Sequence, residues 1–424
     1  MKTKAVRLYG KADLRLEEFE LPQMRDDEIF ARVVTDSLCM SSYKAVHLGE
    51  DHKRVPSGIA TNPVIIGHEF SGEILEVGGK WQHKFRKGDK FSIQPAMCYP
   101  DGPAGLMSAP GYSYPFAGGD ATYVIIPNEV MEMDCLLTYR GPGFFPASLA
   151  EPLSCVIGAM HACYHVAPGT YRHEMEIRDG GCLALLAGVG PMGLACINYV
   201  LHREDRRPAL FVVTDINRER LERAAQLYTT EFAASRGIEL HYVDTSGMAN
   251  PAAELRRLSG GSGYDEVVVM APVPSVVEQA DDILARDGCL NFFSGPAESP
   301  FKAPFNFYNV HYASTHVVGT SGGNTEDMKE ALDIMGRGLD PAGMVTHVGG
   351  LNSVIDTTLN LPSIPGGKKL IYTHVDMPLT AIADFGKVGK PVYDALDAIC
   401  KAHNSLWSVE AEEYLLAHAR ELQA

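Results

Sequence analysis

Residues 182–201 read CLALLAGVGPMGLACINYVL, a run of twenty residues without a charged side chain. This length satisfies the requirement for a membrane-spanning helix. However, the run contains three glycines, and Pro191 stands near its middle, where a single helix would be weakened. A buried strand, a tight glycine turn and the start of a buried helix fit the composition better, so we expect no membrane segment here.

The turn within this run carries a G-x-G-x-x-G pattern. It consists of Gly188, Val189, Gly190, Pro191, Met192 and Gly193. Between a strand and a helix, the first glycine makes the tight turn, the second lets the backbone approach a pyrophosphate, and the third lets helix pack on strand. The helix N-terminus adds free N–H groups and the positive end of its dipole. The sequence therefore predicts a dinucleotide site at these six residues.

An acidic residue, Asp215, follows at the end of the next strand-like run, LFVVTDIN (210–217). An aspartate at this place accepts hydrogen bonds from the adenosine ribose and repels a 2′-phosphate, which favours NAD(H). Arg218 and Arg220 lie just beyond and offer partners for a 2′-phosphate, so NADP(H) stays an alternative. A glycine-rich turn followed by an Asp helix cap is the interpretation without a cofactor.

Outward from this motif, apolar runs alternate with helical patterns. The runs are LALLAGVG (183–190), LFVVTDIN (210–217), IELHYVDTS (238–246), DEVVVMA (265–271) and CLNFFSG (289–295), and the helical patterns include RERLERAAQLY (218–228) and SVVEQADDILARDG (275–288). Such alternation predicts a parallel sheet covered on both faces, the Rossmann-type α/β arrangement.

The flanking segments differ from this pattern. Before Glu151, short runs with partial period-two alternation, such as EIFARVVTDSL (28–38), indicate a mainly-β domain. The end of the chain, AEEYLLAHARELQA (411–424), is expected to be helical. We therefore expect a first domain over 1–157, a dinucleotide-binding domain over 158–325, and a return to the first domain with a helical tail over 326–424.

Composition restricts the function classes. The chain of 424 residues has 37 basic and 53 acidic side chains and a net charge of −16, which disfavours nonspecific nucleic-acid or anionic-membrane binding. Nine cysteines without a C-x-x-C pair argue against a disulfide scaffold and for a reducing compartment. Because the N-terminus MKTKAVRLYG has no apolar stretch, we expect a cytoplasmic protein without a secretory signal.

The first domain contains candidate metal ligands. They are Cys39 in SLCMSSYK, His68 and Glu69 in GHEFSGE, and Glu151 in AEPLSC. Zinc accepts thiolate, imidazole and carboxylate together, and a catalytic zinc keeps one position open for water or substrate. The spacing itself is uninformative, because a single Cys is usually a core residue and a single Glu usually lies on a solvated face.

Longer strings give these residues a context. The Cys-x-Ser, Gly-His-Glu and Glu-Pro-Leu patterns, together with the glycine motif, resemble the zinc-dependent medium-chain alcohol/polyol dehydrogenase family, on its sorbitol dehydrogenase side. The strings most similar to the L-sorbose 1-phosphate reductases are RLYGKADLRLE (7–17), VTDSLCMSSYK (34–44), GGDATYVIIPNEVM (118–131), CLNFFSGP (289–296) and VGTSGGNTEDM (318–328). The resemblance implies a GroES-like catalytic domain beside the Rossmann domain and assembly as a homodimer or homotetramer.

The resemblance also implies site roles. Cys39 and His68 would bind zinc, while Glu69 and Glu151 remain alternative carboxylate ligands. Ser41 would hydrogen-bond the reacting oxygen and pass its proton outward. Where several relatives carry a relay histidine, this chain has Lys44. The loop over 97–119 contains a single cysteine, Cys98, so we expect one catalytic zinc and no structural zinc.

The function that the resemblance implies is NAD(P)H-linked reduction of a ketose phosphate, L-sorbose 1-phosphate to D-glucitol 6-phosphate. A dianionic phosphate needs a local cation; Lys44 is the first candidate, and Lys368 and Lys369 are the second. A dehydrogenase of a free polyol or of another sugar-alcohol phosphate is the main alternative. Two further interpretations are a zinc-free quinone or enoyl reductase and a non-enzymatic dinucleotide-binding protein.

Overall fold

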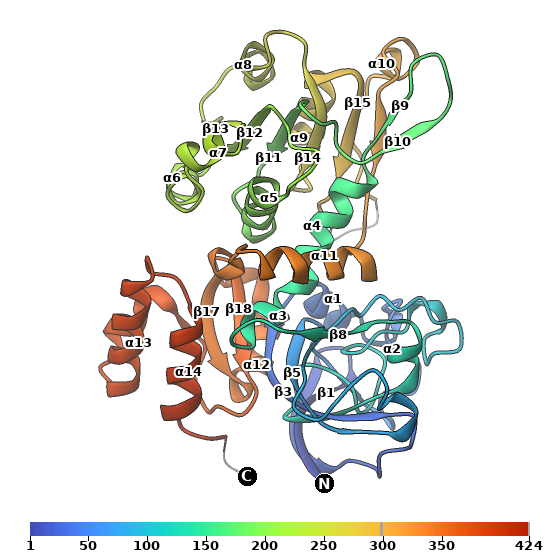
Figure 1. Ribbon diagram of the computed structural model, residues 1–424, viewed down its shortest axis with the longest axis vertical. Helices are drawn as coiled ribbons and strands as arrows, with labels where there is room; N and C mark the ends of the chain where they lie inside the picture. The colour runs from blue at the N-terminus through green and yellow to red at the C-terminus, as the bar shows by residue number, and fades with distance from the viewer. Residues whose placement is uncertain (297–299, 423–424) are drawn as a thin grey trace. The chain divides into compact units, whose positions relative to one another are not determined.

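The computed structural model describes residues 1–296 and 300–422. The chain forms two compact units. The first comprises Met1–Glu151, Asn324–Gly336 and Asp340–Ala424, and the second comprises Pro152–Gly323 and Arg337–Leu339. The chain therefore leaves the first unit after Glu151, builds most of the second, and returns at Asn324 (Figure 1).

The second unit is built on a parallel six-stranded sheet with the order β13-β12-β11-β14-β15-β16. The six strands of this sheet are β11 (Cys182–Leu186), β12 (Leu210–Asp215), β13 (Glu239–Asp244), β14 (Tyr264–Val269), β15 (Leu284–Phe292) and β16 (His316–Val318). Two further strands, β9 (Tyr164–Val166) and β10 (His173–Met175), pair with each other in a separate antiparallel sheet of the unit. Its helices are α5 (Pro191–His202), α6 (Arg218–Leu227), α7 (Thr230–Ser235), α8 (Pro251–Leu258), α9 (Pro274–Ile283) and α10 (Phe307–Tyr312), and α4 (Ala150–Ala162) leads into the unit. The expected α/β fold class is confirmed.

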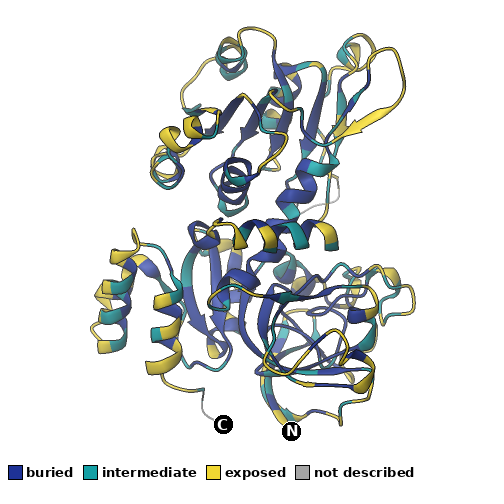
Figure 2. Cartoon of the chain, viewed as in Figure 1, coloured by how far each residue is buried: buried dark blue, intermediate teal, exposed yellow. Residues whose placement is uncertain are grey.

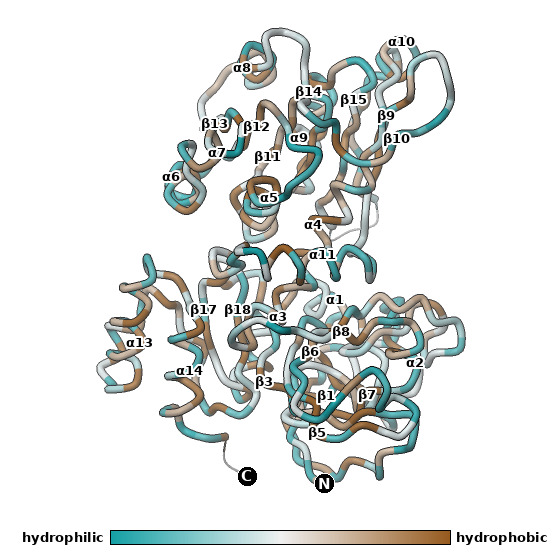
Figure 3. The backbone as a smooth tube through the Cα atoms, in the orientation of Figure 1, coloured by the Kyte–Doolittle hydropathy of each residue, from teal (hydrophilic) through white to brown (hydrophobic). Residues whose placement is uncertain are grey.

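The uncharged run over 182–201 forms β11, a turn and α5. All residues of α5 from Gly193 to Leu201 are buried, which explains its hydropathy (Figure 3). Among the residues that the structure describes, no helix has the length and hydropathy needed to cross a bilayer.

The first unit holds a mixed eight-stranded sheet and a three-stranded sheet. The eight-stranded sheet has the order β19-β17-β18-β3-β5-β6-β8, with β7 also paired to β3, and the smaller sheet has the order β2-β1-β4. Its strands are β1 (Lys2–Gly10), β2 (Asp13–Glu20), β3 (Ile29–Leu38), β4 (Val64–Ile65), β5 (Phe70–Val77), β6 (Lys90–Ile93), β7 (Tyr123–Ile126), β8 (Leu136–Tyr139), β17 (Val345–Gly350), β18 (Lys368–Tyr372) and β19 (Thr380–Ala381). Its helices are α1 (Met40–Leu48), α2 (Asn128–Glu132), α3 (Phe145–Ser148), α11 (Thr325–Gly336), α12 (Val354–Leu359), α13 (Pro391–Ala402) and α14 (Val409–His418).

The C-terminal helices belong to the core of the first unit. Trp407, Leu396 and Leu415 are buried in one hydrophobic cluster with residues of β17 and β18. Figure 2 shows the buried and exposed sides of α13 and α14.

Two predicted helices end earlier than expected. The pattern over 275–288 is helical only to Ile283, because the chain from Leu284 onward joins the sheet as β15 beside β14. The tail is helical only to His418, because Glu421 pairs with Val375 in an antiparallel bridge. The last two residues of that prediction, 423–424, lie outside the described residues.

Candidate active site

Three neighbouring strands of the mixed sheet converge on the candidate metal ligands. Because β3 runs antiparallel to both β5 and β18, the end of β3 lies beside the beginnings of the other two. Cys39 directly follows β3, His68 and Glu69 directly precede β5, and Lys368 is the first residue of β18. The sheet thus brings together residues that are far apart in the sequence.

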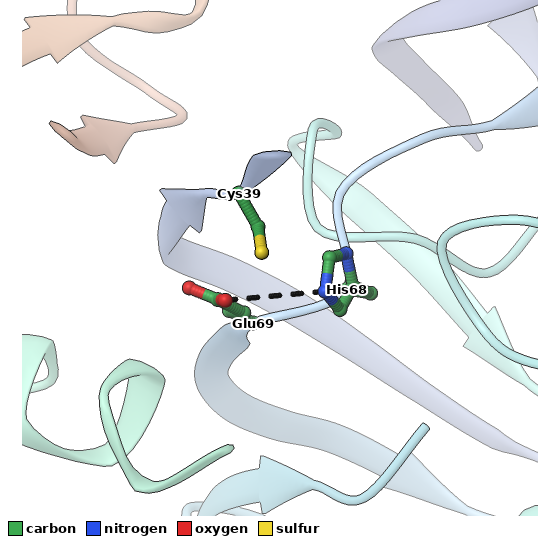
Figure 4. A group of neighbouring side chains, drawn as sticks. All are labelled: Cys39, His68 and Glu69. Atoms are coloured by element: carbon green, nitrogen blue, oxygen red, sulfur yellow. Dashed lines mark ion pairs between the residues drawn. The ribbon is translucent and has the colours of Figure 1, made fainter. Parts of the chain in front are cut away.

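The side chains of Cys39, His68 and Glu69 point toward one another (Figure 4). One ligand atom from each lies within 4.8 Å of the others, and His68 Nε2 is 3.9 Å from Glu69 Oε1. Burial raises the pKa of the Cys39 thiol to about 12 and lowers the pKa of His68 to about 4. Without a cation, both groups are therefore neutral at neutral pH.

Hydrogen bonds fix the orientation of His68. Its Nδ1 is 3.0 Å from Ser42 Oγ, so its Nε2 faces the cluster. Ser41 Oγ lies 3.2 Å from this Nε2 and donates to Cys39 Sγ at 3.1 Å. Tyr112 donates from its hydroxyl to Ser41 Oγ at 2.8 Å and lies 3.1 Å from His68 Nε2.

Two further charged residues surround the cluster. Lys368 Nζ, itself buried, binds both carboxylate oxygens of Glu69 at 2.5 and 2.6 Å, and Ser37 donates to the same carboxylate. Glu151 is buried in the first turn of α4. Beyond the main effect of burial, its charge helps to raise the pKa of Cys39, so it lies within electrostatic reach of the cluster.

Lys44 lies on α1, three residues after Ser41, and is partly buried. It stands near His52: burial, followed by the charges of Arg54, Lys53 and Lys44, lowers the pKa of His52 to about 4. Lys369 is buried and donates to the carbonyl oxygens of Ile364 and Gly367. Neither Lys368 nor Lys369 is therefore presented to solvent as a phosphate ligand.

The glycine motif forms the turn between β11 and α5. Gly190 is the N-cap of α5, and Pro191 begins the helix. A Cβ on Gly193 would stand 2.0 Å from the carbonyl oxygen of Gly188, so close packing of the turn requires this glycine. A Cβ on Gly190 would meet nothing within 4 Å, and its φ of −72° suits any residue. The protein itself therefore does not require Gly190, whereas a ligand in that open space would.

Asp215 lies at the end of β12, beside this turn. Its Oδ1 accepts hydrogen bonds from the N–H groups of Ile216 and Asn217 at 2.9 Å, and its Oδ2 is 3.4 Å from Val189 N. Arg220 lies in the first turn of α6 with an exposed side chain, and its backbone N–H is capped by the side chain of Asn217.

Two family models match this chain. Residues 25–134 match the alcohol dehydrogenase GroES-like domain, and residues 207–337 match the zinc-binding dehydrogenase domain. The chain is 52% identical over 421 residues to L-sorbose 1-phosphate reductase of Klebsiella pneumoniae, covering 99% of this chain and 98% of that protein. The chain belongs to the zinc-dependent medium-chain alcohol/polyol dehydrogenase family.

Other relatives agree with this assignment. Mannitol-1-phosphate 5-dehydrogenase of Aliivibrio fischeri is 49% identical over 417 residues, covering 98% of this chain and 97% of that protein. The solved structure of 2R,3R-butanediol dehydrogenase from Bacillus subtilis has the same fold, with a TM-score of 0.68 and 21% identity over 88% of this chain and 99% of that chain. This dehydrogenase is therefore a zinc-dependent oxidoreductase with a nicotinamide cofactor.

The residues present fit both a zinc ion and a nicotinamide dinucleotide. Thiol, imidazole and carboxylate converge as a donor set that zinc prefers, and the bond from Ser42 orients the imidazole as outer partners of zinc ligands do. At the glycine turn, the open space over Gly190 and the N-terminus of α5 suit a pyrophosphate.

Sequence reasoning missed one residue of this dehydrogenase's site, Tyr112, and gave another, Lys368, a different role. Tyr112 lies in the stretch over 97–119 that reads only as a long loop, and no spacing links it to Ser41. The sequence favours Lys368, after Gly366 and Gly367, as a candidate phosphate cation, whereas in the structure it binds the carboxylate of Glu69. Only the pairing of β18 with β3 reveals that Lys368 lies beside Glu69.

Proposed function

We propose that this dehydrogenase reduces L-sorbose 1-phosphate to D-glucitol 6-phosphate. The observation that carries the proposal is the nearly full-length identity of 52% to the Klebsiella pneumoniae enzyme named for that ketose phosphate. Lys44 lies on α1, three residues after Ser41. It supports the proposal as a cation that could attract the phosphate group of the substrate.

The Aliivibrio fischeri relative suggests a second candidate substrate. Its name describes oxidation at C5 of mannitol 1-phosphate, whose product, fructose 6-phosphate, carries phosphate at the end far from the carbonyl. In L-sorbose 1-phosphate, the phosphate is on the carbon beside the carbonyl. Because either ketose phosphate can yield D-glucitol 6-phosphate, the choice is tested by NMR of the two ketose phosphates consumed in competition. Preferential consumption of L-sorbose 1-phosphate supports the proposal, and preferential consumption of fructose 6-phosphate contradicts it.

The metal ligands of the proposed mechanism are Cys39 and His68, with the third from Glu69 or Glu151. A zinc ion held there supplies Lewis-acid polarisation of the substrate carbonyl. Lys368 balances the carboxylate charge of this buried group. One zinc per subunit is proposed, because the stretch over 97–119 contains a single cysteine, Cys98.

Ser41 and Tyr112 form the proposed proton path. A bound nicotinamide cofactor would supply hydride to the carbonyl carbon, and Ser41 Oγ–H would donate a proton to the carbonyl oxygen. Tyr112 Oη–H, 2.8 Å away, would pass its proton to Ser41 while taking one from solvent, because burial raises the pKa of Tyr112 and disfavours a tyrosinate. The path needs no histidine at the position of Lys44.

For the cofactor, we propose a preference for NADH over NADPH, with Asp215 accepting hydrogen bonds from the ribose hydroxyls. Replacing Asp215 with Ser removes the repulsion of a 2′-phosphate and should shift relative affinity toward NADPH by about 1–3 kcal/mol. If the parent enzyme already prefers NADPH, then Arg218 or Arg220, and not Asp215, determines the cofactor preference.

We also propose a cytoplasmic homodimer or homotetramer. All nine cysteines are free, which suits a reducing compartment. Support for self-association comes from the edge strand β16, where Val317 and the nearby Phe307, Tyr308 and Tyr312 are exposed beside an apolar groove. Sedimentation equilibrium tests this assembly, and a monomer at micromolar concentration contradicts it.

A further inference from the structure

Arg54 lies beside the candidate active site, and no described carboxylate pairs with its guanidinium. Arg7 and Arg32, also partly buried in the first unit, pair with Glu17 and Glu73. Within residues 1–296 and 300–422, no carboxylate lies within ion-pair distance of the Arg54 guanidinium. In a chain of net charge −16, a partly buried guanidinium without a carboxylate partner is suited to an anionic ligand.

The protein holds this arginine in place. Its Nη1 donates to the carbonyl oxygen of Met107 at 3.3 Å, and Ser113 Oγ donates to the carbonyl oxygen of Arg54 at 2.6 Å. The guanidinium carbon lies 5.7 Å from the centre of the Tyr112 ring. Among the described residues, Nε and Nη2 have no acceptor, so one edge of the planar group remains available for a ligand.

Tyr112 connects this cation to the reacting atoms. The tyrosine carries the Arg54 guanidinium over its ring and hydrogen-bonds Ser41 through its hydroxyl. The ring of His52 stacks on the same tyrosine at 5.8 Å. Burial and then the charge of Arg54 lower the pKa of His52 to about 4, which agrees with a positive local field.

We propose that Arg54 binds the phosphate monoester of the substrate through Nε and Nη2 while the substrate carbonyl oxygen faces Ser41. This inference rests on the proposed function and deepens it. A guanidinium edge matches two phosphate oxygens, which a lysine ammonium cannot do with the same geometry. Since Arg54 and Ser41 contact the same tyrosine, one phosphorylated ketose can present its phosphate to Arg54 and its carbonyl oxygen to Ser41.

The test compares the parent enzyme with Arg54→Gln, Arg54→Lys and the matched control Arg86→Gln. Arg86 is an exposed arginine of the same unit, in the turn before β6, whose first residue, Lys90, pairs with Glu73 and not with the site residues that precede β5. For each protein, the ratio of kcat/KM for L-sorbose 1-phosphate to kcat/KM for L-sorbose is measured. We expect Arg54→Gln to lower this ratio by about 10- to 150-fold, the value of a charged hydrogen-bonded contact. Arg54→Lys should recover part of the loss, and Arg86→Gln should leave the ratio unchanged.

An unchanged ratio in Arg54→Gln would overturn the inference, whether both values of kcat/KM stay the same or fall equally. Calorimetric binding of D-glucitol 6-phosphate and of inorganic phosphate, which needs no turnover, separates this outcome from failure of the proposed function. If the parent enzyme shows no preference for the sugar phosphate, the proposed function fails. In that case, phosphate binding that weakens in Arg54→Gln still supports the anion site, and binding of equal strength in both proteins refutes it.

Discussion

Lys368 and Lys369 are neighbours in β18, yet their ammonium groups meet different surroundings. Burial opposes the charge of Lys368, but attraction to Glu69 and the thiolate form of Cys39 outweighs it, and the pKa of Lys368 is raised. Lys369 faces backbone carbonyl oxygens instead, and burial followed by the charge of Lys368 lowers its pKa to about 8. Alternation of side chains across a strand separates the two residues.

The pKa of Lys369 gives a pH prediction. Between pH 8 and 10.5, the unfolded chain holds a proton on this lysine that the folded chain has released. Stability should therefore rise with pH in this window, by about 1.4 kcal/mol per pH unit from this group. An NMR titration of labelled lysine side chains, with the Lys369 signal assigned through Lys369→Arg, checks the value. A midpoint above 10 would show that the carbonyl oxygens retain the charge.

The metal assignment is also tested at a single residue. Cys39→Ala should reduce bound zinc from one per subunit to nearly none, because a site with three protein ligands loses its thiolate. NADH binding should persist, since the glycine turn is built from other residues. Elemental analysis with Cys98→Ala as control measures this. Two zinc ions per parent subunit, or full zinc in Cys39→Ala, would refute the assignment.

At the scale of elements, the turn between β11 and α5 separates the needs of folding from the needs of binding. Gly193→Ala should lower the melting temperature, because its Cβ would collide with the carbonyl oxygen of Gly188. Gly190→Ala should melt like the parent enzyme, because its Cβ meets open space. If that space receives the cofactor, Gly190→Ala should raise the Kd for NADH by about 10-fold or more. Thermal melting measures the stability of each variant, and a fluorescence titration measures its affinity for NADH. An unchanged NADH affinity in Gly190→Ala would show that the cofactor binds elsewhere.

Helix α14 is attached to the first unit through a buried carboxylate. Glu412 accepts hydrogen bonds from the backbone N–H groups of Phe144 and Phe145 and from the hydroxyl of Tyr372. Glu412→Gln puts an amide donor against one of these donors and should cost about 1–3 kcal/mol of unfolding free energy. The neighbouring Glu413→Gln, on the exposed side, is the control. Equal denaturant midpoints for the two variants would mean that α14 is held by apolar packing alone.

The ends of helices and strands are predicted least well from sequence patterns. The pattern over 275–288 continues the helical period, but residues from Leu284 onward gain sheet hydrogen bonds beside β14. Asp287 adopts a φ of 59° and receives bonds from Val166 and Arg178. These partners come from distant parts of the chain, so no local pattern reveals them.

At the scale of the whole molecule, the fold class follows from the sequence because apolar runs, helical periods and the glycine motif each have a local physical cause. The convergence of Cys39, His68 and Glu69 needed the additional information of resemblance, because their spacing carries no signal. Tyr112 and Arg54 required the structure itself, since only folding brings Tyr112 to Ser41 and Arg54 to Tyr112. Sequence reasoning thus reaches local elements and motifs, whereas contacts made by tertiary packing lie beyond it.

The central claim is that the zinc-dependent site reduces a sugar carrying phosphate. The most direct measurement is kcat/KM of the zinc-loaded enzyme with NADH for L-sorbose 1-phosphate and for L-sorbose. Remote binding energy from the phosphate should raise kcat/KM for the phosphorylated sugar by about 100-fold or more, and chelation of zinc should abolish both activities. Equal kcat/KM for the two sugars would contradict the claim and identify the enzyme as a dehydrogenase of free polyols.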